Sequence, residues 1–400
     1  MSFSQGGTSY TSVSGARATS NVGSSVAIRE VQEAMITYEP YQKPILTWLL
    51  SKKFGKAPTG NPKFEWMYST WLPQRDTVTI SGGATSEDNI TVGDSTLYQV
   101  GTKFVVEETG EVCIVDSIAS SQIDITKVGS GNITAVTSGT IKFLGDSFEQ
   151  GSNSATAKSV NKEFAYNYVE IFKKAVEETE SQQSNVEYGP VDYMRNKMDR
   201  MGEFLLDIEK NLLHGIRSTF TGVQNGSYTQ HATGGLFDTT SAFIYTYYNF
   251  SGSTPDEAWF FNTFLKTLYA KGTNRKRMYC GANLLQAIND FSKIKQITHV
   301  TESEYGVNIT KINHPFGTLE LAWHPMLDGD VFANYGIALD IGVGNVIRYR
   351  YKAGNGKNRD LQFRDYGEYY KQSDTRKGEW LGEIGFEIQG NEYHGIVKPA

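Results

Sequence analysis

Cysteine is scarce in this sequence, because the 400 residues include only Cys113 and Cys280. Two cysteines exclude the disulfide framework of a small secreted domain and a cysteine-based zinc module. Long apolar runs are also missing, since the apolar cluster at residues 44–50 falls far short of the ~20 residues that a membrane-spanning helix needs. The first residues show no secretory signal pattern. We therefore expect a soluble protein that is made inside a cell and has no membrane partner.

An excess of basic residues is missing too. The 38 Lys and Arg are outnumbered by 44 Asp and Glu, which gives a formal net charge of −6. A protein that binds nucleic acid over its whole surface should be basic, so this class is excluded. We expect the short basic clusters to pair with acids of a neighbouring chain more than to contact phosphates. These clusters are Lys52, Lys53 and Lys56; residues 275–277; and Arg348, Arg350 and Lys352.

Catalytic motifs are absent as well. The sequence contains no glycine-rich phosphate loop, dinucleotide-binding fingerprint, nucleophile elbow or His-Glu-x-x-His helix. His314 and His324 flank a predicted hairpin, but neither is accompanied by acids or cysteines in a recognised metal-ligand spacing. We therefore predict no catalytic residue, no cofactor and no metal site.

Glycine and aromatic residues are abundant instead. Glycine accounts for 40 residues, and Phe, Trp and Tyr together make up 12% of the chain. Such a composition indicates many turns and strands, and a chain of this length can bury a large core. Helical and strand patterns both occur, so the sequence predicts an α+β fold.

The strongest helical pattern covers residues 191–213. Its apolar residues recur at intervals of three and four, and Pro190 and Gly215 bound the run. We interpret this stripe as a face buried in the core. Its members are Val191, Met194, Met198, Met201, Leu205, Ile208 and Leu212.

Other segments divide the first half of the chain. Residues 1–25 are rich in Ser, Gly and Thr and predict a flexible arm. Residues 63–73 alternate as a strand, and residues 76–148 predict a small all-β module with a hairpin turn at Thr109-Gly110. Residues 160–178 remain open between helix and strand. Alternation around the turn predicts core positions in the module at Phe104, Val106, Val112, Ile114 and Ile123.

The second half mixes helices and strands. Thr254 and Pro255 predict the start of a helix, followed by a strand at 277–280 and another helix that contains Leu284 and Ile288. Further strands are predicted at 307–312, 319–323, 337–340, 346–351 and 380–388.

The order of several motifs resembles one group of tailed-bacteriophage major capsid proteins. The resemblance covers most of residues 35–395 and implies the Hong Kong 97-type capsid fold. It is carried by the 191–213 helix and by residues 44–50, Phe64-Glu-Trp66, 167–172, 281–285, 314–319, 334–340 and 379–385.

The resemblance also implies a division of the chain, in which residues 160–178 are mainly β. An N-terminal arm and an extended loop precede a peripheral domain built on a spine helix and an axial domain, and a small β domain is inserted in the loop. The expected ranges are 1–50 for the arm; 51–75 and 149–185 for the loop limbs; 76–148 for the insertion; 186–224 and 378–400 for the peripheral domain; and 225–377 for the axial domain.

The function implied is that of a non-enzymatic shell subunit in an icosahedral or prolate phage head. The alternatives are the shell of a cellular nanocompartment with the same fold and, third, a virion hydrolase or carbohydrate-binding protein. The implied partners are further copies of the chain in hexamers and pentamers, a separate scaffolding protein, a portal, and packaged double-stranded DNA bound without sequence preference. Assembly in the cytoplasm of a host bacterium and residence in the virion follow. Candidate subunit contacts are Trp48, Lys52, Lys53, Trp66, Trp71, Arg348 and Arg350.

Overall fold

The computed structural model places two units, and each is described by itself. One unit comprises Met1–Phe64 and Tyr166–Ala400, and the other comprises Glu65–Ala165. The structure describes residues 43–51, 55–119, 122–152, 154–185, 192–223, 226–239, 244, 246–252, 254–291, 301–304, 307–342, 346–367 and 374–400. The predicted arm at 1–25 therefore lies outside the described residues.

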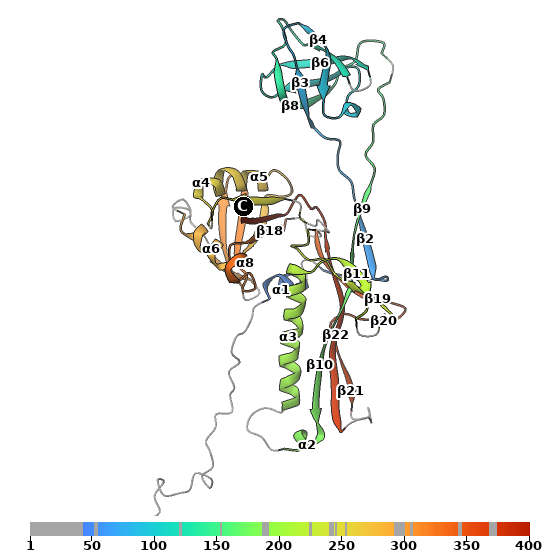
Figure 1. Ribbon diagram of the computed structural model, residues 1–400, viewed down its shortest axis with the longest axis vertical. Helices are drawn as coiled ribbons and strands as arrows, with labels where there is room; N and C mark the ends of the chain where they lie inside the picture. Colours follow the sequence, from blue (N-terminus) through green and yellow to red (C-terminus); the bar gives the residue numbers. More distant parts are fainter. Residues whose placement is uncertain are drawn as a thin grey trace, which may run out of the picture. The chain divides into compact units, whose positions relative to one another are not determined.

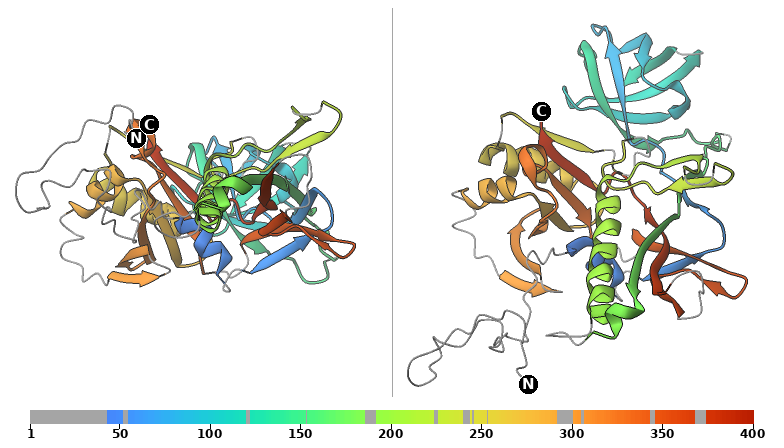
Figure 2. Two further views of the ribbon diagram at one scale, coloured as in Figure 1. Left: turned by 90° about the horizontal axis from the view of Figure 1, so that it is seen from below. Right: turned by 60° about the horizontal axis from the view of Figure 1, so that its bottom comes forward.

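The larger unit contains a long helix, α3 (Asp192–His214), which packs against a six-stranded sheet. Its bounds match the predicted helix closely. In both views of Figure 2, α3 runs beside β10, and Trp380 of β22 donates a hydrogen bond of 2.9 Å to the Lys197 carbonyl. The sheet has the order β1-β19-β22-β10, with β20 paired to β19 and β21 paired to β22. Its strands are β1 (Lys56–Thr59), β10 (Glu170–Thr179), β19 (Ile347–Gly354), β20 (Lys357–Asn358), β21 (Gln362–Gly367) and β22 (Thr375–Ile388).

A seven-stranded sheet in the same unit has the order β13-β23-β18-β14-β17-β16-β15. A phenylalanine-rich core that includes Phe260, Phe264 and Met278 lies between this sheet and its helices. The strands are β13 (Tyr247–Phe250), β14 (Arg275–Cys280), β15 (Thr301–Glu304), β16 (Val307–His314), β17 (Gly317–Trp323), β18 (Gly336–Asp340) and β23 (Gly395–Pro399).

The remaining elements of the larger unit are short. The helix expected to start at Thr254 is instead capped by Asp256, whose side chain accepts a hydrogen bond from the Ala258 amide, and it runs through a π-helical segment. The short elements are α1 (Pro44–Leu50), α2 (Glu180–Gln183), α4 (Glu257–Trp259), the π-helix η3 (Phe260–Phe264), α5 (Leu265–Leu268), α6 (Ala282–Asn289), α8 (Gly329–Phe332), and the paired strands β11 (Ser218–Thr221) and β12 (Thr229–Ala232).

Sheet membership differs from the expected division at two places. Strands β19 to β21 fall in the range expected for the axial domain, yet they pair in the six-stranded sheet with β22. Strand β23 falls in the range expected for the peripheral domain, yet it lies between β13 and β18 in the seven-stranded sheet. Local patterns specify strands but not their partners, so the sequence could not show which sheet these segments join.

The second unit contains a closed six-stranded barrel with the order β3-β4-β7-β6-β5-β8. Its own core is apolar and includes Phe104, Val115 and Ile125. The two ends of the barrel chain lie together, because Arg75 at the start of β3 pairs with Lys142 in β8. The elements are β3 (Arg75–Ile80), β4 (Ser86–Val92), the 3-10 turn η2 (Ser95–Leu97), β5 (Thr102–Val106), β6 (Val112–Ala119), β7 (Gln122–Lys127) and β8 (Val136–Asp146).

The barrel hairpin corrects two predicted core positions. Gly110 has φ of +72°, which favours glycine, and β5 pairs with β6 as expected. Phe104 lies opposite Cys113, however, and opposite residues of an antiparallel pair share a face. Cys113 and Val115 are therefore buried, whereas Val112 and Ile114 are only half-buried.

Strands β2 (Lys63–Tyr68) and β9 (Glu163–Tyr168) pair as a two-stranded ribbon, and the border between the two units runs through both strands. The open question over residues 160–178 is settled as strand, because β9 and β10 cover most of this range. A buried asparagine, Asn167, marks the place where β9 gives way to β10. Its amide nitrogen donates to the Phe386 carbonyl at 2.8 Å, and its oxygen accepts from the Gly234 amide at 2.9 Å.

Candidate functional site

A fully buried carboxylate, Glu209 of α3, joins three segments that are far apart in the sequence. Its two oxygens accept hydrogen bonds from the backbone amides of Ile45 and Leu46 at 3.0 and 2.7 Å, in the first turn of α1. One of these oxygens also lies 2.9 Å from Nε2 of His324, which follows β17. These first-turn amides have no partner within their own helix, so the carboxylate satisfies them. We call Glu209, His324 and α1 the arm anchor.

The hydrogen bonds of His324 define its tautomer. Its Nδ1 accepts from the Met326 amide at 3.2 Å, so the proton of the neutral ring sits on Nε2 and is donated to Glu209. The imidazole is fully buried, and its two ring nitrogens both have partners. This histidine is therefore a structural link and not a metal ligand.

Helix α1 completes the arm anchor with apolar contacts. Ile45, Leu46, Trp48 and Leu49 are at most 2% exposed. The Trp48 ring meets Tyr279 edge to face, with centroids 6.5 Å apart. The prediction that Trp48 contacts a neighbouring subunit is therefore wrong for the folded chain, because the side chain is inside its own core.

The basic clusters also find acids within their own chain. Arg275 and Arg277 both bind the buried carboxylate of Glu320, at 2.6 and 2.7 Å. Arg350 pairs with Glu387 of the adjacent strand. The prediction of acidic partners on a neighbouring chain is thus wrong for these residues. The neighbouring paired strands supply the acids, and strand pairing cannot be deduced from the spacing of basic residues.

The other predicted contacts differ in how far their side chains are exposed. Trp66 is 7% exposed, so its side chain is not available on the surface, whereas Trp71 is 89% exposed. Arg348 is half-buried, and its Nε has no hydrogen-bond partner among the described residues. Lys52 and Lys53 lie outside the described residues. Met67 of β2 and Phe164 of β9 are also exposed, at 60% and 62%.

The stripe on α3 is covered only along part of its length. Ile208 and Leu212 are buried, and Leu205 is half-buried, where α1 packs on the helix. The prediction of burial is wrong for the methionines of the first half, because no described element covers this face there. Met194, Met198 and Met201 are 53%, 71% and 41% exposed, and Val191 lies outside the described residues.

The burial of Glu209 was not predicted, because an acid between Ile208 and Lys210 resembles a residue of the charged, solvent-exposed face. One signal was available: Glu209 stands four residues after Leu205 and four before Leu213, a spacing that places it on the apolar side. The helix face that meets the sheet is formed by Tyr193 and Phe204, which the stripe did not include.

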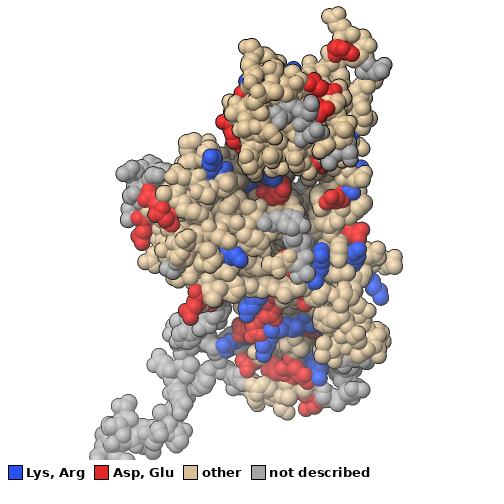
Figure 3. All heavy atoms as spheres, turned by 45° about the horizontal axis from the view of Figure 1, so that its top comes forward, with Lys and Arg blue, Asp and Glu red and all other residues tan. Residues whose placement is uncertain are grey.

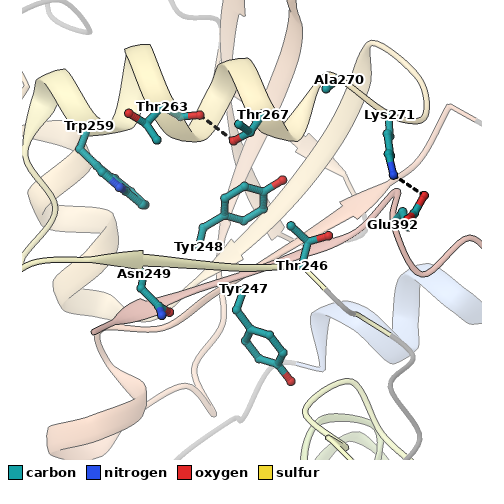
Figure 4. Close-up of a pocket in the computed structure, with 10 residues that line it drawn as sticks. All are labelled: Thr246, Tyr247, Tyr248, Asn249, Trp259, Thr263, Thr267, Ala270, Lys271 and Glu392. Carbon is teal, nitrogen blue, oxygen red and sulfur yellow. Dashed lines mark hydrogen bonds and ion pairs between the residues drawn. The ribbon is translucent and has the colours of Figure 1, made fainter. Parts of the chain in front are cut away.

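A pocket with a volume of about 510 Å³ lies between β13 and the helices α4 and α5 (Figure 4). Tyr248 and Trp259 supply its aromatic wall, and Lys271 pairs with Glu392 at its rim at 2.6 Å. A second cavity of about 320 Å³ lies beside the arm anchor, and burial lowers the pKa of His214 in its lining.

Two further classes of site are absent from the described parts of the chain. No group of three or more His, Cys, Asp or Glu side chains there could hold a metal ion. None of the described helices has the length and apolarity to cross a membrane, and α3 in particular is rich in charge.

The chain contains a long helix that packs on a sheet, a β-ribbon that carries exposed apolar side chains, and a barrel. The model of the SU10 major capsid protein family matches residues 5–400. The chain belongs to the SU10 major capsid protein family. A curated relative, the major capsid protein of Pseudomonas phage PaMx41, is 22% identical over 321 residues, which cover 75% of this chain and 72% of the relative.

Solved structures similar to this major capsid protein include the capsid of a native GTA particle, with a TM-score of 0.49 and 8% identity. This match covers 96% of this chain and 98% of the GTA capsid chain. The SrpI encapsulin of Synechococcus elongatus PCC 7942 has a TM-score of 0.39 and 10% identity, covering 60% and 77%. These scores are low, so the assignment rests on the family model. This protein is a structural capsid protein of a virion with an α+β fold, and copies of it associate into a shell.

Proposed function

We propose that this capsid protein forms hexamers and pentamers that close an icosahedral or prolate head around double-stranded DNA. The observation that carries the proposal is the apolar surface of the ribbon and the segment after it. Trp71, Met67 and Phe164 are each at least 60% exposed. Large apolar side chains exposed on a ribbon and on the segment after it mark a protein contact, which a neighbouring subunit supplies in a closed shell.

The domain division supports the same assembly. We take α3 and the six-stranded sheet as the peripheral domain, the seven-stranded sheet with its helices as the axial domain, and the β2–β9 ribbon as the extended loop. Glu209 then holds α1, at the end of the range expected for the arm, on the peripheral domain. Lys52, Lys53, Trp71 and Arg348 remain candidate subunit contacts.

The proposed partners beyond the chain itself are a separate scaffolding protein, a portal and DNA. The first 42 residues carry few charges, unlike a fused scaffold rich in charged helix. A net charge of −6 supplies no uniform attraction to phosphate, so DNA contacts are local, salt-sensitive and independent of sequence. The role is structural and not enzymatic, and assembly takes place in the cytoplasm of the host bacterium.

The content of purified particles tests the proposal. Particles from infected cells are treated with nuclease, opened, and analysed for DNA and for protein cargo. We expect protected double-stranded DNA without a preferred sequence. Shells that contain an enzyme and no DNA would instead identify a nanocompartment.

A further inference from the structure

One edge of the seven-stranded sheet is open. Strand β13 stands at the end of the sheet order, and among the described strands it pairs only with β23. The Phe250 carbonyl accepts from the Ala400 amide at 3.0 Å, so the even-numbered residues of β13 face β23. Because the backbone groups of successive residues in a strand point to opposite sides, Tyr247 and Asn249 turn their N–H and C=O groups to the open edge. Both residues are exposed.

This edge lacks the usual protection against pairing with another chain. Natural edge strands are commonly protected by charged residues or by proline. Strand β13 has neither, since its sequence is Tyr-Tyr-Asn-Phe. The opposite edge strand of the sheet, β15, includes Glu302 and Glu304 among its four residues. The sheet therefore has one neutral edge that can accept a further strand.

The pocket of about 510 Å³ lies beside this edge. Tyr248 points from β13 toward the helices and Trp259 reaches toward the strand from α4, whereas Tyr247 points to the other face of the sheet (Figure 4). Thr263 and Thr267 add hydroxyl groups to the lining. Successive side chains of a strand point to opposite faces of its sheet. A strand added to β13 therefore directs every second side chain toward the pocket.

The surroundings of the pocket suit an uncharged segment. Lys271 and Glu392 are the two charged residues of the lining, and they pair with each other at 2.6 Å. Figure 3 shows few charged side chains over the seven-stranded sheet and its helices, left of the centre of the view, and many lower down over α3. Aromatic walls with polar groups between them suit an aromatic side chain, above all one with a hydroxyl group. The fitting occupant is an extended, uncharged segment with one such residue.

The N-terminal part of the chain, outside the described residues, contains such a segment. Residues 1–16 include no Asp, Glu, Lys, Arg or His. Residues 8–13 have the sequence Thr-Ser-Tyr-Thr-Ser-Val, which is rich in strand-forming types and has Tyr10 as its aromatic residue. Residues 14–42 can span up to about 100 Å when fully extended, so the segment can reach another copy of the chain.

We propose that residues 8–13 of a neighbouring copy add as a strand to the open edge of β13, with Tyr10 in the pocket. The main chain of the added strand pairs with Tyr247 and Asn249, and the Tyr10 ring supplies specificity. Each copy donates a segment at one place and accepts one at another. Contacts of this heterologous kind close into rings, as hexamers and pentamers require. The inference rests on the proposed function, since it needs copies in contact.

A photo-crosslinker tests the position of Tyr10. Benzoyl-phenylalanine replaces Tyr10 in the full-length protein, which is assembled into particles and irradiated. We expect covalent dimers on a denaturing gel, with the link mapped by mass spectrometry to β13, α4 or α5. The same probe at Ser20 is the control and should not label these elements. A link within one chain, a link to other elements, or no link in intact particles would overturn the inference.

A proline tests the open edge. Asn249→Pro removes the outward amide and leaves the bonds between β13 and β23, because proline is tolerated on the outer side of an edge strand. We expect about tenfold less crosslink from the Tyr10 probe, with urea unfolding of the subunit unchanged. Asn249→Thr keeps the amide and should keep the full yield. Equal yields from the two variants would contradict strand addition at β13.

A variant outside the sheet covers the case in which Asn249→Pro does not fold. Tyr10→Ala leaves the seven-stranded sheet untouched and should lower the temperature at which particles disassemble. Ser20→Ala is the matched control and should leave that temperature unchanged. The same disassembly temperature for both variants would rule out Tyr10 as an anchor.

Two results separate this inference from the proposed function. If wild-type protein forms no closed particle, the proposed function itself is wrong. If closed particles form but the Tyr10 probe links to none of the three elements, only the assignment of residues 8–13 to the open edge is wrong.

Discussion

Glu209 is an acid that stands where an amphipathic helix would place an apolar side chain. Burial of an unpaired carboxylate would be strongly unfavourable, but here both oxygens accept hydrogen bonds from α1 and one also meets His324. The residue thus ties the end of the N-terminal segment to the long helix. Its role depends on negative charge as well as on shape.

The arm anchor predicts that Glu209→Gln destabilises the subunit by about 3 kcal/mol. The substitution removes the negative charge, and the new side-chain NH₂ group faces a backbone N–H where the carboxylate had an acceptor oxygen. The measurement is urea unfolding of the subunit. Glu203→Gln is the matched control, since that side chain is on the same helix and is 44% exposed. It should change the free energy of unfolding by less than about 0.5 kcal/mol. Equal effects of the two variants would argue against the arm anchor.

The two faces of α3 predict opposite results for two truncations. Phe204 is 1% exposed and faces the sheet, so Phe204→Ala should cost about 4 kcal/mol of subunit stability. Met198 is 71% exposed, so Met198→Ala should cost less than about 0.5 kcal/mol. Thermal and urea unfolding of both variants provide the comparison. A larger loss for Met198→Ala would restore the buried methionine stripe that the sequence alone predicts.

A buried histidine predicts how stability depends on pH. His394 accepts from the Asp340 amide at 3.1 Å through Nδ1, and burial lowers its pKa from 6.5 to about 4. The unfolded chain therefore binds a proton in a pH range where the folded chain does not. The stability that this group contributes is complete above pH 6.5 and is lost as the pH falls toward 4, by about 3 kcal/mol.

The check is the pH dependence of urea unfolding for wild type and for His394→Gln. Glutamine can keep an acceptor and a donor in place but does not titrate. The variant should lose less stability than wild type between pH 6.5 and pH 4. Parallel pH profiles for the two proteins would rule out this role for His394.

At the scale of elements, local patterns succeeded where one element decides its own structure. The predicted helix at 191–213 is α3, and the hairpin at Thr109-Gly110 is β5 and β6. The spacing of apolar residues over 160–178 was ambiguous between helix and strand, because β9 and β10 are separate strands with different partners. The burial of the α3 methionines was predicted wrongly for a related reason. Periodicity identifies the apolar face of a helix but not the length over which another element covers that face.

The barrel is the element whose independence can be tested. It has its own core, and its first and last strands are paired at Arg75 and Lys142. Replacement of residues 78–144 by a short Gly/Ser linker should therefore leave the larger unit folded. Circular dichroism and thermal unfolding of the deletion protein measure this, and any particles should disassemble at lower temperature than wild type. Loss of helical signal from the deletion protein would show that the barrel is required for the fold of the larger unit.

At the scale of the whole molecule, the sequence could indicate a shell subunit only through its resemblance to a family. Glu209, His324 and α1 meet through tertiary contacts that no spacing reveals, and the acids facing Arg277 and Arg350 come from paired strands. The net charge follows from the composition, but only the division of the chain into two units shows that the barrel carries the excess of acids.

Assembly is the central claim, and cryo-electron microscopy of the chain expressed in a bacterium tests it most directly. The exposed apolar side chains of the ribbon require cover from neighbouring copies. We predict closed shells built of hexamers and pentamers, in which each subunit contains the long helix and a distinct barrel. A 44.5 kDa monomer that stays monomeric at every concentration, with or without a co-expressed scaffolding protein, would contradict the account.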